Sequence, residues 1–316
     1  MVVTGSFIHV RNILKMKQID MDNKYKGELI LDEPMSKHTS WGIGGPADLF
    51  YSPKNRKDLI GFLSGLDSTL PITWIGRGTN VLVRDSGIRG VVINTRSFLK
   101  EIVKTSEHLY KVEAGVTCVE LALFCQKNGI GPAAFFSGIP GSIGGALTMN
   151  AGSFGTETWD LVKEVEVINE KGDISFLEKE SFDIAYRTVT FPFRLWFLSC
   201  SMFLSSDEQT TKDNLIELRN QRIRTQPLSA DTCGSVFKNP PGNFAGALIE
   251  GSGLKGFKIG SASISEQHAN FIVNEGGATA RDIENLIKHT RQVVKKNYDI
   301  DLQPEVRIIG EASLSE

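Results

Sequence analysis

The stretch SGIPGSIGGALTMNAGSFG, residues 137–155, differs most from the rest of the sequence. It contains too much glycine for a packed helix or strand and too little charge for a flexible linker. Glycine has no Cβ, so such a backbone can approach a large flat ligand and turn its N–H groups toward phosphates. A structural glycine-rich loop has the same composition, so both interpretations stay open at this point. The residues expected to contact a cofactor are Gly138, Ile139, Pro140, Gly141, Ser142, Gly144, Gly145, Asn150 and Gly152.

A second glycine-containing segment lies earlier, between apolar strands expected at residues 72–75 and 81–83. Its residues are Gly76, Arg77, Gly78, Thr79 and Asn80. The glycines allow backbone N–H groups to face a diphosphate, although a tight turn between strands has the same pattern. The segment is not a Rossmann fingerprint, because GxGxxG is absent and a strand follows where a helix is required. Two such segments together favour a dinucleotide cofactor.

The flanking sequence mixes helices and strands without regular alternation, which predicts an α+β fold. Capping boxes at Thr117 and Thr279 begin two of the expected helices. Apolar alternation on both sides of residues 171–173 predicts a hairpin. Helices are expected at 53–66, 117–128, 211–222 and 279–297, and further strands at 90–95 and 109–113. A polar run near 205–212 is the best candidate for a domain boundary.

The bulk composition is that of a globular protein of one large or two to three modest domains. The chain has 316 residues, 41% hydrophobic and 23% charged, with a net charge of −2. No overall field favours nucleic acid or a membrane as partner. The four cysteines show no metal-ligand or disulfide spacing, so we expect buried or idle thiols in a reducing compartment and no metal. Residues 1–20 lack a secretory signal and the apolar run at 191–204 is too short to span a membrane, so we expect a cytoplasmic location. Residues 1–30 are expected to form a leader, partly disordered, of which residues 1–20 are dispensable.

Three further groups of polar residues follow in the second half of the chain. Ser235, Lys238 and Asn239 come after a glycine, and the last two offer donors for phosphate or uracil oxygens. Asn-Pro-Pro-Gly is also strong turn chemistry, so a surface turn is an equal alternative. Glu305 and Arg307 alternate with apolar residues, so both would face one side of an expected strand, where an exposed ion-pair face is the default. His268 precedes an apolar run, and a histidine satisfied within the protein is the commoner case.

Taken together, the sequence resembles the UDP-N-acetylenolpyruvoylglucosamine reductase family of flavoenzymes. The resemblance rests on seven stretches in the family's order, which span about residues 38–310. They are HTSWGIGGPADLF, WIGRGTNVLVRD, FSGIPGSIGGALTMNAGSFG, AYRTVTF, GSVFKNPPG, HANFIVN and LQPEVRIIG. The short connection from AYRTVTF to GSVFKNP looks like the shorter of the family's two architectural types. The chain departs from the family at Thr225, where lysine is usual, so phosphate contact shifts to Arg222, Arg224 or Lys238.

The resemblance implies an FAD-binding domain of the vanillyl-alcohol oxidase type, built of two subdomains, at residues 31–208. A C-terminal α+β substrate-binding domain at 209–316 would follow. It also implies non-covalent FAD, NADPH as co-substrate, a UDP-sugar substrate, and a place in peptidoglycan precursor synthesis. The family's catalytic positions fall on Arg187, Ser235 and Glu305, and Lys238, Asn239 and His268 are expected to bind substrate.

Two other functions are alternatives to this one. The first is another FAD-dependent sugar or sugar-acid oxidase of the same superfamily. Many such enzymes attach FAD through histidine, and no histidine lies in or near residues 76–85. The second is a catalytically inactive nucleotide-binding module, which the presence of Arg187, Ser235 and Glu305 together argues against.

Overall fold

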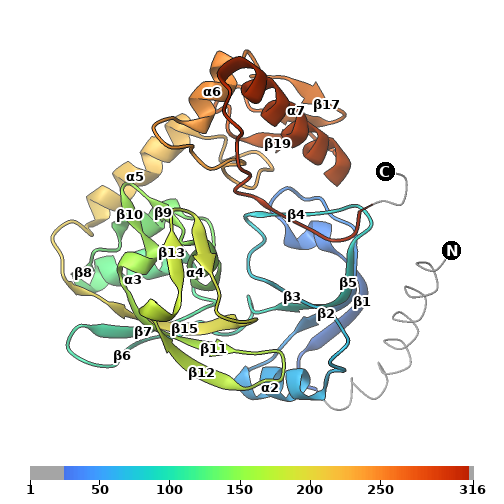
Figure 1. The fold of residues 1–316 in the computed structure, drawn as a ribbon. Coiled ribbons are helices and arrows are strands. Elements are labelled where there is room, and N and C mark those ends of the chain that lie inside the picture. Colours follow the sequence, from blue (N-terminus) through green and yellow to red (C-terminus); the bar gives the residue numbers. More distant parts are fainter. Residues whose placement is uncertain (1–24, 313–316) are drawn as a thin grey trace. The chain divides into compact units, whose positions relative to one another are not determined.

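The computed structural model describes residues 25–312 and divides the chain into two compact units. Of these residues, unit 1 comprises 25–31, Asp48–Arg77 and Gly90–Asn220, and unit 2 comprises Asp32–Ala47, Gly78–Arg89 and 221–312. The predicted leader lies outside the described residues up to residue 24, and strand β1 already begins at Glu28. Mixed helices and strands in both units confirm the predicted α+β class (Figure 1).

The described part of unit 1 contains two sheets of more than two strands. A four-stranded sheet has the order β1-β2-β5-β3, and β3 pairs with β5 in parallel. Strands β1, β2 and β5 each include a few residues that are assigned to unit 2. A five-stranded antiparallel sheet has the order β12-β11-β15-β7-β6. The strands of these sheets are β1 (Glu28–Pro34), β2 (Pro46–Ser52), β3 (Ile72–Ile75), β5 (Ile88–Asn94), β6 (Ile102–Lys104), β7 (Leu109–Glu113), β11 (Val162–Ile168), β12 (Ile174–Glu178) and β15 (Trp196–Phe203). Three short pairs add β8 (Ile130–Gly131) with β16 (Ser205–Ser206), β9 (Gly152–Ser153) with β10 (Thr156–Glu157), and β13 (Asp183–Ala185) with β14 (Thr188–Thr190).

The helices of unit 1 begin at recognisable caps. The side chain of Asn55 caps α2 (Arg56–Gly65), and Thr117 and Glu120 form the predicted capping box of α3 (Cys118–Asn128). Gly129 ends α3 in the left-handed conformation, as expected of a C-terminal glycine. The predicted hairpin is confirmed by the antiparallel pairing of β11 with β12. The 3-10 helices η2 (Ala134–Gly138), η3 (Thr158–Asp160) and η4 (Lys179–Ser181) complete the unit.

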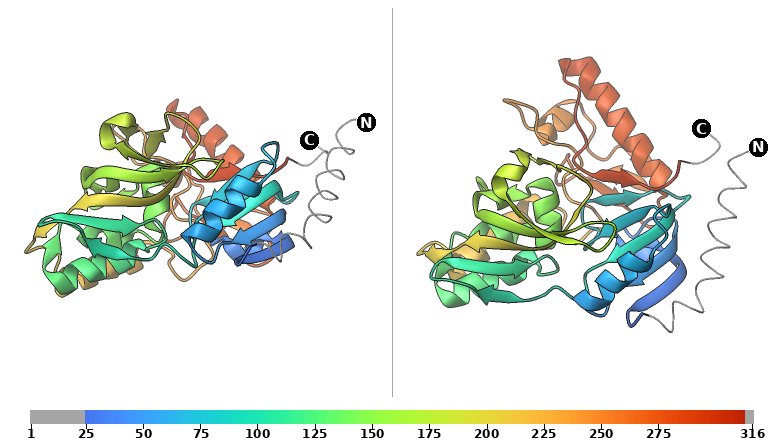
Figure 2. Two further views of the ribbon diagram at one scale, coloured as in Figure 1. Left: turned by 90° about the horizontal axis from the view of Figure 1, so that it is seen from below. Right: turned by 60° about the horizontal axis from the view of Figure 1, so that its bottom comes forward.

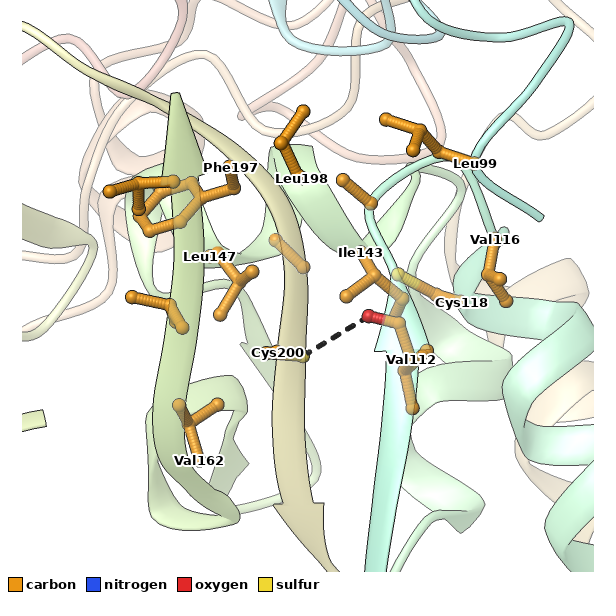
Figure 3. Close-up of a cluster of buried hydrophobic side chains, with 14 of the residues drawn as sticks. Leu99, Val112, Val116, Cys118, Ile143, Leu147, Val162, Phe197, Leu198 and Cys200 are labelled. Atoms are coloured by element: carbon orange, nitrogen blue, oxygen red, sulfur yellow. Dashed lines mark hydrogen bonds between the residues drawn. The ribbon is translucent and has the colours of Figure 1, made fainter. Parts of the chain in front are cut away.

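The expectation that residues 137–155 contain no helix is wrong. Helix α4 (Ile143–Met149) lies within them, although Gly144 and Gly145 occupy its first turn. Each glycine costs a helix about 1 kcal/mol relative to alanine. Complete burial of Ile143 and Leu147 contributes about 1.5–3 kcal/mol each, which outweighs that cost. Figure 3 shows both side chains within a cluster of buried apolar side chains.

The four cysteines are free and buried. Figure 3 shows Cys200 directed at the carbonyl oxygen of Val112, at 3.8 Å from Sγ. Burial raises the pKa of Cys125 and of Cys233 to about 12. These thiols therefore stay protonated and act as small apolar side chains.

Unit 2 has its own core and its own strand pairing. Strand β4 (Val81–Val83) pairs in parallel with β20 (Arg307–Ile309), although the two lie more than 200 residues apart in sequence. A three-stranded antiparallel sheet contains β17 (Lys258–Ile259), β18 (Ala262–Ile264) and β19 (Ile272–Asn274). The helices are η1 (Met35–His38), α6 (Ala245–Gly251) and α7 (Ala280–Tyr298), the long red helix in Figures 1 and 2. Helix α5 (Lys212–Thr225) carries the chain into this unit.

Helix α7 is fastened to the loop that follows β4. The carboxylate of Asp85 accepts hydrogen bonds from the backbone N–H groups of Ala280 (2.9 Å) and Arg281 (3.0 Å). Arg84 donates to Glu284 from Nε (2.8 Å) and Nη2 (3.2 Å). A carboxylate at a helix N-terminus and a two-point arginine contact are both strong interactions. They hold β4, and hence the segment before it, against the rest of unit 2.

Candidate active site

The predicted cofactor loop of unit 1 uses several of its own backbone amides internally. The N–H of Ile143 donates to Val116 O (2.8 Å) and that of Gly144 to Ala114 O (2.9 Å), while the Ser142 hydroxyl accepts from Gly145 N–H (3.4 Å). A Cβ on Gly144 would lie 3.0 Å from Cβ of Ala114, so this glycine serves close packing. A Cβ on Gly145 would meet nothing nearer than 3.7 Å. Gly145 thus leaves open the space that a ligand needs for a close approach.

The structure brings the two glycine segments together within unit 1. A Cβ on Gly76 would lie only 2.9 Å from the Ser142 hydroxyl oxygen. The neighbouring Arg77 has a buried Nε that finds no hydrogen-bond partner among the described residues. A buried donor without a partner calls for an explanation, and a bound anionic group would satisfy it. The diphosphate of a dinucleotide has the required charge and acceptors, so this part of unit 1 fits FAD.

Arg187 lies in the turn between β13 and β14, in the left-handed backbone conformation (φ 53°). Its guanidinium donates to the carbonyl oxygens of Asn150 (3.2 Å) and Gly152 (2.6 Å). It also forms an ion pair with Glu157, with Nη1 3.6 Å from Oε1. The structure therefore joins the predicted catalytic arginine to the end of the predicted cofactor loop.

Asn150 is held from all sides by the protein. Its amide nitrogen donates to Glu157 Oε2 (2.7 Å) and to Ala185 O (3.2 Å), and its amide oxygen accepts from Trp159 N–H (3.2 Å). The residue is 2% exposed. Asn150 thus shapes the loop for a ligand from within. Glu157, which contacts both Asn150 and Arg187, was not foreseen, because a single glutamate carries no sequence signal of such a role.

In unit 2, the segment from Gly78 to Asn80 lies beside Glu305. The Asn80 side chain donates to Glu305 O (3.1 Å), and Asn80 O accepts from Arg307 N–H (3.1 Å). Gly78 has φ 63°, and a Cβ there would lie 1.9 Å from His38 O, so only glycine fits. Glu305 precedes β20, so the expected strand that would hold Glu305 and Arg307 on one face begins only at Arg307.

Ser235 and Glu305 come from distant parts of the sequence and meet through one peptide. The N–H of Glu305 donates to the carbonyl oxygen of Val236, the residue after Ser235, at 2.8 Å. Ser235 is half-buried, and its hydroxyl forms no hydrogen bond with any described residue. A half-buried hydroxyl without an internal partner is available for a bound molecule.

Two of the three predicted substrate-binding residues, Asn239 and His268, lie at the start of α6. The Asn239 side-chain oxygen accepts from Ala245 N–H (3.0 Å), and Lys238 follows Phe237 in the same segment. A Cβ on Gly246, in the first turn of α6, would lie 3.1 Å from Cε1 of His268. Burial lowers the pKa of His268, and nearby Lys255 lowers it further. The imidazole is therefore neutral near pH 7 and its Nδ1 accepts from Asn270 N–H (3.2 Å).

Thr225, where the family usually has lysine, lies in a segment whose polar groups form hydrogen bonds within the protein. The Thr225 hydroxyl donates to Gln221 O (2.8 Å), and Arg222 Nε donates to Gln226 Oε1 (3.0 Å). The Gln267 side chain donates to the carbonyl oxygens of Ile223 (3.0 Å) and Arg224 (3.2 Å). The end of α5 is thus fixed next to the loop that carries His268.

Among residues 25–312, no helix is long and apolar enough to span a membrane. The same residues contain no group of three or more metal-ligating side chains placed to hold an ion.

Comparison with known proteins places the chain in a family. The profile of the FAD binding domain matches residues 47–177, and that of the UDP-N-acetylenolpyruvoylglucosamine reductase C-terminal domain matches residues 226–309. The reductase from Alkalilimnicola ehrlichii is 46% identical over 287 residues, which cover 90% of this chain and 96% of the relative. That from Legionella pneumophila (strain Corby) is 46% identical over 291 residues, 92% of this chain and 94% of the relative. The chain belongs to the UDP-N-acetylenolpyruvoylglucosamine reductase family.

A solved structure of the family agrees with this membership. The crystal structure of UDP-N-acetylenolpyruvylglucosamine reductase from Thermus caldophilus is 29% identical in sequence, with a TM-score of 0.74. It covers 90% of this chain and 98% of its own. The resemblance drawn from the sequence is therefore confirmed, as is the fold of an FAD-binding domain followed by a C-terminal domain characteristic of the reductase family. Membership also decides against an oxidase of the wider superfamily.

The two matched ranges divide the candidate residues of this reductase-family chain. The range of the FAD binding domain contains both glycine segments, which agrees with FAD as the predicted cofactor. The C-terminal range contains Ser235, His268 and Glu305. Arg187 lies between the two ranges, so its role rests on the AYRTVTF stretch and on its contacts in unit 1.

Proposed function

We propose that this chain reduces UDP-N-acetylglucosamine enolpyruvate to UDP-N-acetylmuramate, with FAD as its bound cofactor and NADPH as the reductant. The observation that carries the proposal is the 46% identity to curated reductases over 90% of the chain. The close placement of Ser235 and Glu305 in unit 2 supports it, because the reaction needs two such groups near one carbon. The product belongs to peptidoglycan precursor synthesis. Four free, buried cysteines are compatible with a reducing compartment, so we place the reaction in the cytoplasm.

We assign the FAD to residues 31–208 and the UDP-sugar to residues 209–316. Gly76, Arg77 and Ser142 would hold the diphosphate of FAD, and the open side of Gly145 would admit the ligand. When bound, FAD supplies the hydride chemistry that no amino-acid side chain provides. The attachment is non-covalent, because no histidine lies within residues 76–85 and the His38 side chain is hydrogen-bonded to Glu33, with Nε2 2.9 Å from Oε1.

The substrate's UDP group is recognised in unit 2. Lys238 supplies a cation for a phosphate, and His268, neutral and with Nδ1 already accepting, offers Nε2–H to an oxygen of the ligand. Asn239 is exposed, and its side-chain oxygen accepts from Ala245 N–H, which leaves its amide nitrogen to donate to a ligand. This arrangement suits a ligand rich in acceptors.

The protein's chemical task is to place charge and a proton on the enolpyruvyl group. Adding hydride to its methylene carbon leaves negative charge on the neighbouring carbon and its carboxylate. Arg187 would bind the carboxylate with its planar guanidinium, and a protonated Glu305 would donate to the oxygen on which the charge grows. Ser235 Oγ then gives its proton to the neighbouring carbon, which completes the saturated product. The hydroxyl regains a proton from solvent.

One assay tests the proposed function. Purified protein should oxidise NADPH in the presence of UDP-N-acetylglucosamine enolpyruvate, and not when UDP-N-acetylglucosamine replaces it, because the latter has no double bond to reduce. The protein should be yellow, and acid precipitation should leave the flavin in the supernatant. NADPH oxidation without the enolpyruvyl substrate, with oxygen as the acceptor, would instead indicate an oxidase.

A further inference from the structure

The backbone after Ser235 is held by one buried asparagine. The side-chain oxygen of Asn270 accepts from Phe237 N–H (2.9 Å), and its side-chain nitrogen donates to Phe237 O (2.8 Å). The main-chain oxygen of Asn270 accepts from Val236 N–H (2.9 Å). Asn270 is 4% exposed, so these hydrogen bonds do not compete with water. Three hydrogen bonds from one residue therefore fix the two residues that follow Ser235.

The same short segment is tied to Glu305 on its other side. Val236 O accepts from Glu305 N–H (2.8 Å), and Phe237 forms an isolated antiparallel bridge with Pro304. The segment after Ser235 thus lies between Asn270 and the chain that carries Glu305. Any shift of Phe237 would change the position of Ser235 relative to Glu305.

The side chain at position 270 has to be both donor and acceptor to make this contact. A single planar amide spans the N–H and the C=O of one residue as a neighbouring strand would. An aspartate would keep the acceptor but set a negative charge against Phe237 O. A serine would be too short to reach both groups. This requirement distinguishes Asn270 from a buried amide whose hydrogen bonds only satisfy its own polar atoms.

Asn270 is in turn oriented by the loop before it. Its N–H donates to His268 Nδ1 (3.2 Å), and the buried Ser265 hydroxyl accepts from the N–H groups of Gln267 (3.1 Å) and His268 (3.3 Å). The loop from Ser265 to Asn270 therefore has an internal order of its own. It connects the predicted substrate-binding histidine to the peptide that holds Ser235.

We propose that Asn270 is a positioning residue of this reductase, which sets the Ser235 hydroxyl relative to Glu305 by fixing both polar groups of Phe237. The inference rests on the proposed function and deepens it. It predicts that Asn270 acts on the proton-transfer half of the reaction, through Ser235, and leaves the reaction with NADPH unaffected.

The experiment compares Asn270→Asp and Asn270→Ser with Asn274→Asp as a matched control. Asn274 lies at the end of β19, and its amide donates to Trp41 O (2.9 Å) and accepts from Gly276 and Ala278, so it is a structural amide away from Phe237. Rapid mixing would measure flavin bleaching by NADPH and, separately, its return with the enolpyruvyl substrate. Because misplacing a reacting group by about 1 Å can cost ~10²-fold, the Asn270 variants should slow the second step roughly 10- to 100-fold. The first step of the Asn270 variants, and both steps of Asn274→Asp, should have rates within about twofold of wild type.

Two further measurements distinguish positioning from general damage. If Asn270 acts through Ser235, the double variant Asn270→Ser/Ser235→Ala should be no slower than Ser235→Ala alone, because coupled residues are not additive. Amide hydrogen exchange, which requires no activity, should accelerate at Val236 and Phe237 in Asn270→Ser and not in the control.

Several results would overturn the inference. They are an additive double variant, equal slowing of both steps, slowing of the same size in Asn274→Asp, or unchanged rates in Asn270 variants that contain normal amounts of flavin. A wild-type protein that fails to oxidise NADPH with the enolpyruvyl substrate would instead contradict the proposed function. In that case accelerated exchange at Val236 and Phe237 would still support the structural part of the inference.

Discussion

Arg187 in unit 1 and Ser235 in unit 2 are both predicted catalytic residues, but the structure employs them in opposite ways. Arg187 holds its surroundings together through two main-chain oxygens and Glu157. Ser235 holds nothing: its hydroxyl has no partner among the described residues, and the segment after it is fixed by Asn270 and Glu305.

The difference determines what mutagenesis can report at each position. A side chain that makes no hydrogen bond of its own, on a backbone that other residues hold, can be removed with little effect on the fold, so its loss reports chemistry. A side chain that also holds the loop cannot, and its loss combines chemistry with structure. Substitutions at the two positions should therefore differ in which property they change.

The largest effect is expected from Ser235→Ala. Reduction by NADPH needs no proton from this side chain, so flavin bleaching should proceed at a near-normal rate. Return of the flavin colour with the enolpyruvyl substrate should slow at least ~10²-fold, since a general acid contributes about 10²–10⁴-fold. The free energy of unfolding should change by less than about 0.5 kcal/mol, as for substitutions that touch no structural feature. Rapid-mixing absorbance and urea denaturation measure the two quantities.

Ser235→Cys is the control for this prediction. It keeps a transferable proton and should retain more activity than the alanine variant. Equal slowing of both steps by Ser235→Ala would mean that the residue positions the flavin or the loop. If neither step slows, the proton comes from another group, and Glu305 is the first candidate.

A mixed effect is expected at Arg187. Arg187→Ala removes charged hydrogen bonds to two carbonyl oxygens, each of about 1.5–3 kcal/mol, and leaves Glu157 without its cation. We expect a loss of about 3 kcal/mol or more in the free energy of unfolding, measured by urea denaturation, together with a raised KM for the enolpyruvyl substrate. Arg187→Lys should recover part of the stability but little of the substrate binding, because an ammonium cannot form the planar fork. A stable Arg187→Ala protein with only kcat lowered would contradict the proposed double role.

The two regions also differ in how far the sequence predicted them. Helices α3 and α7 were predicted with their capping boxes, because a cap and its partner lie three residues apart and act locally. Helix α4 was missed, because glycine propensity argues against it, and the burial of Ile143 and Leu147, which stabilises it, depends on the tertiary structure. Local signals were reliable, and tertiary packing overrode them where glycine was abundant.

For the candidate site, residue types were predictable and their surroundings were not. The family stretches identify Arg187, Ser235 and Glu305, but no spacing rule indicates that Asn270 spans Phe237 across 33 residues. The parallel pairing of β4 with β20 brings Asn80 to Glu305 across 225 residues, which no local pattern records. Contacts of this kind exist only after folding. They determine that the Arg187 side chain stabilises its surroundings, whereas the segment after Ser235 is fixed by other residues.

The smallest effect concerns the pH dependence of the unit 2 contacts. Burial lowers the pKa of His268 below its ordinary value of 6.5, Lys255 lowers it further, and Glu250 opposes the shift. An unfolded chain therefore binds a proton at His268 at a higher pH than the folded chain does. The contribution of this residue to stability is complete above about pH 6.5 and is lost as the pH falls below that value. Protonation of Nδ1 also removes the acceptor for Asn270 N–H, a hydrogen bond of about 0.5–1.5 kcal/mol. His268→Asn retains an acceptor near Nδ1 and does not titrate.

Urea denaturation between pH 8 and pH 5 should give a shallower decline in the free energy of unfolding for this variant than for wild type. His289→Asn serves as the control, because it also replaces an imidazole with an amide, here one stacked on Phe257 at 4.4 Å between ring centroids and remote from Asn270 in sequence. Equal declines in wild type and His268→Asn would show that this histidine does not couple protonation to the segment that holds Ser235.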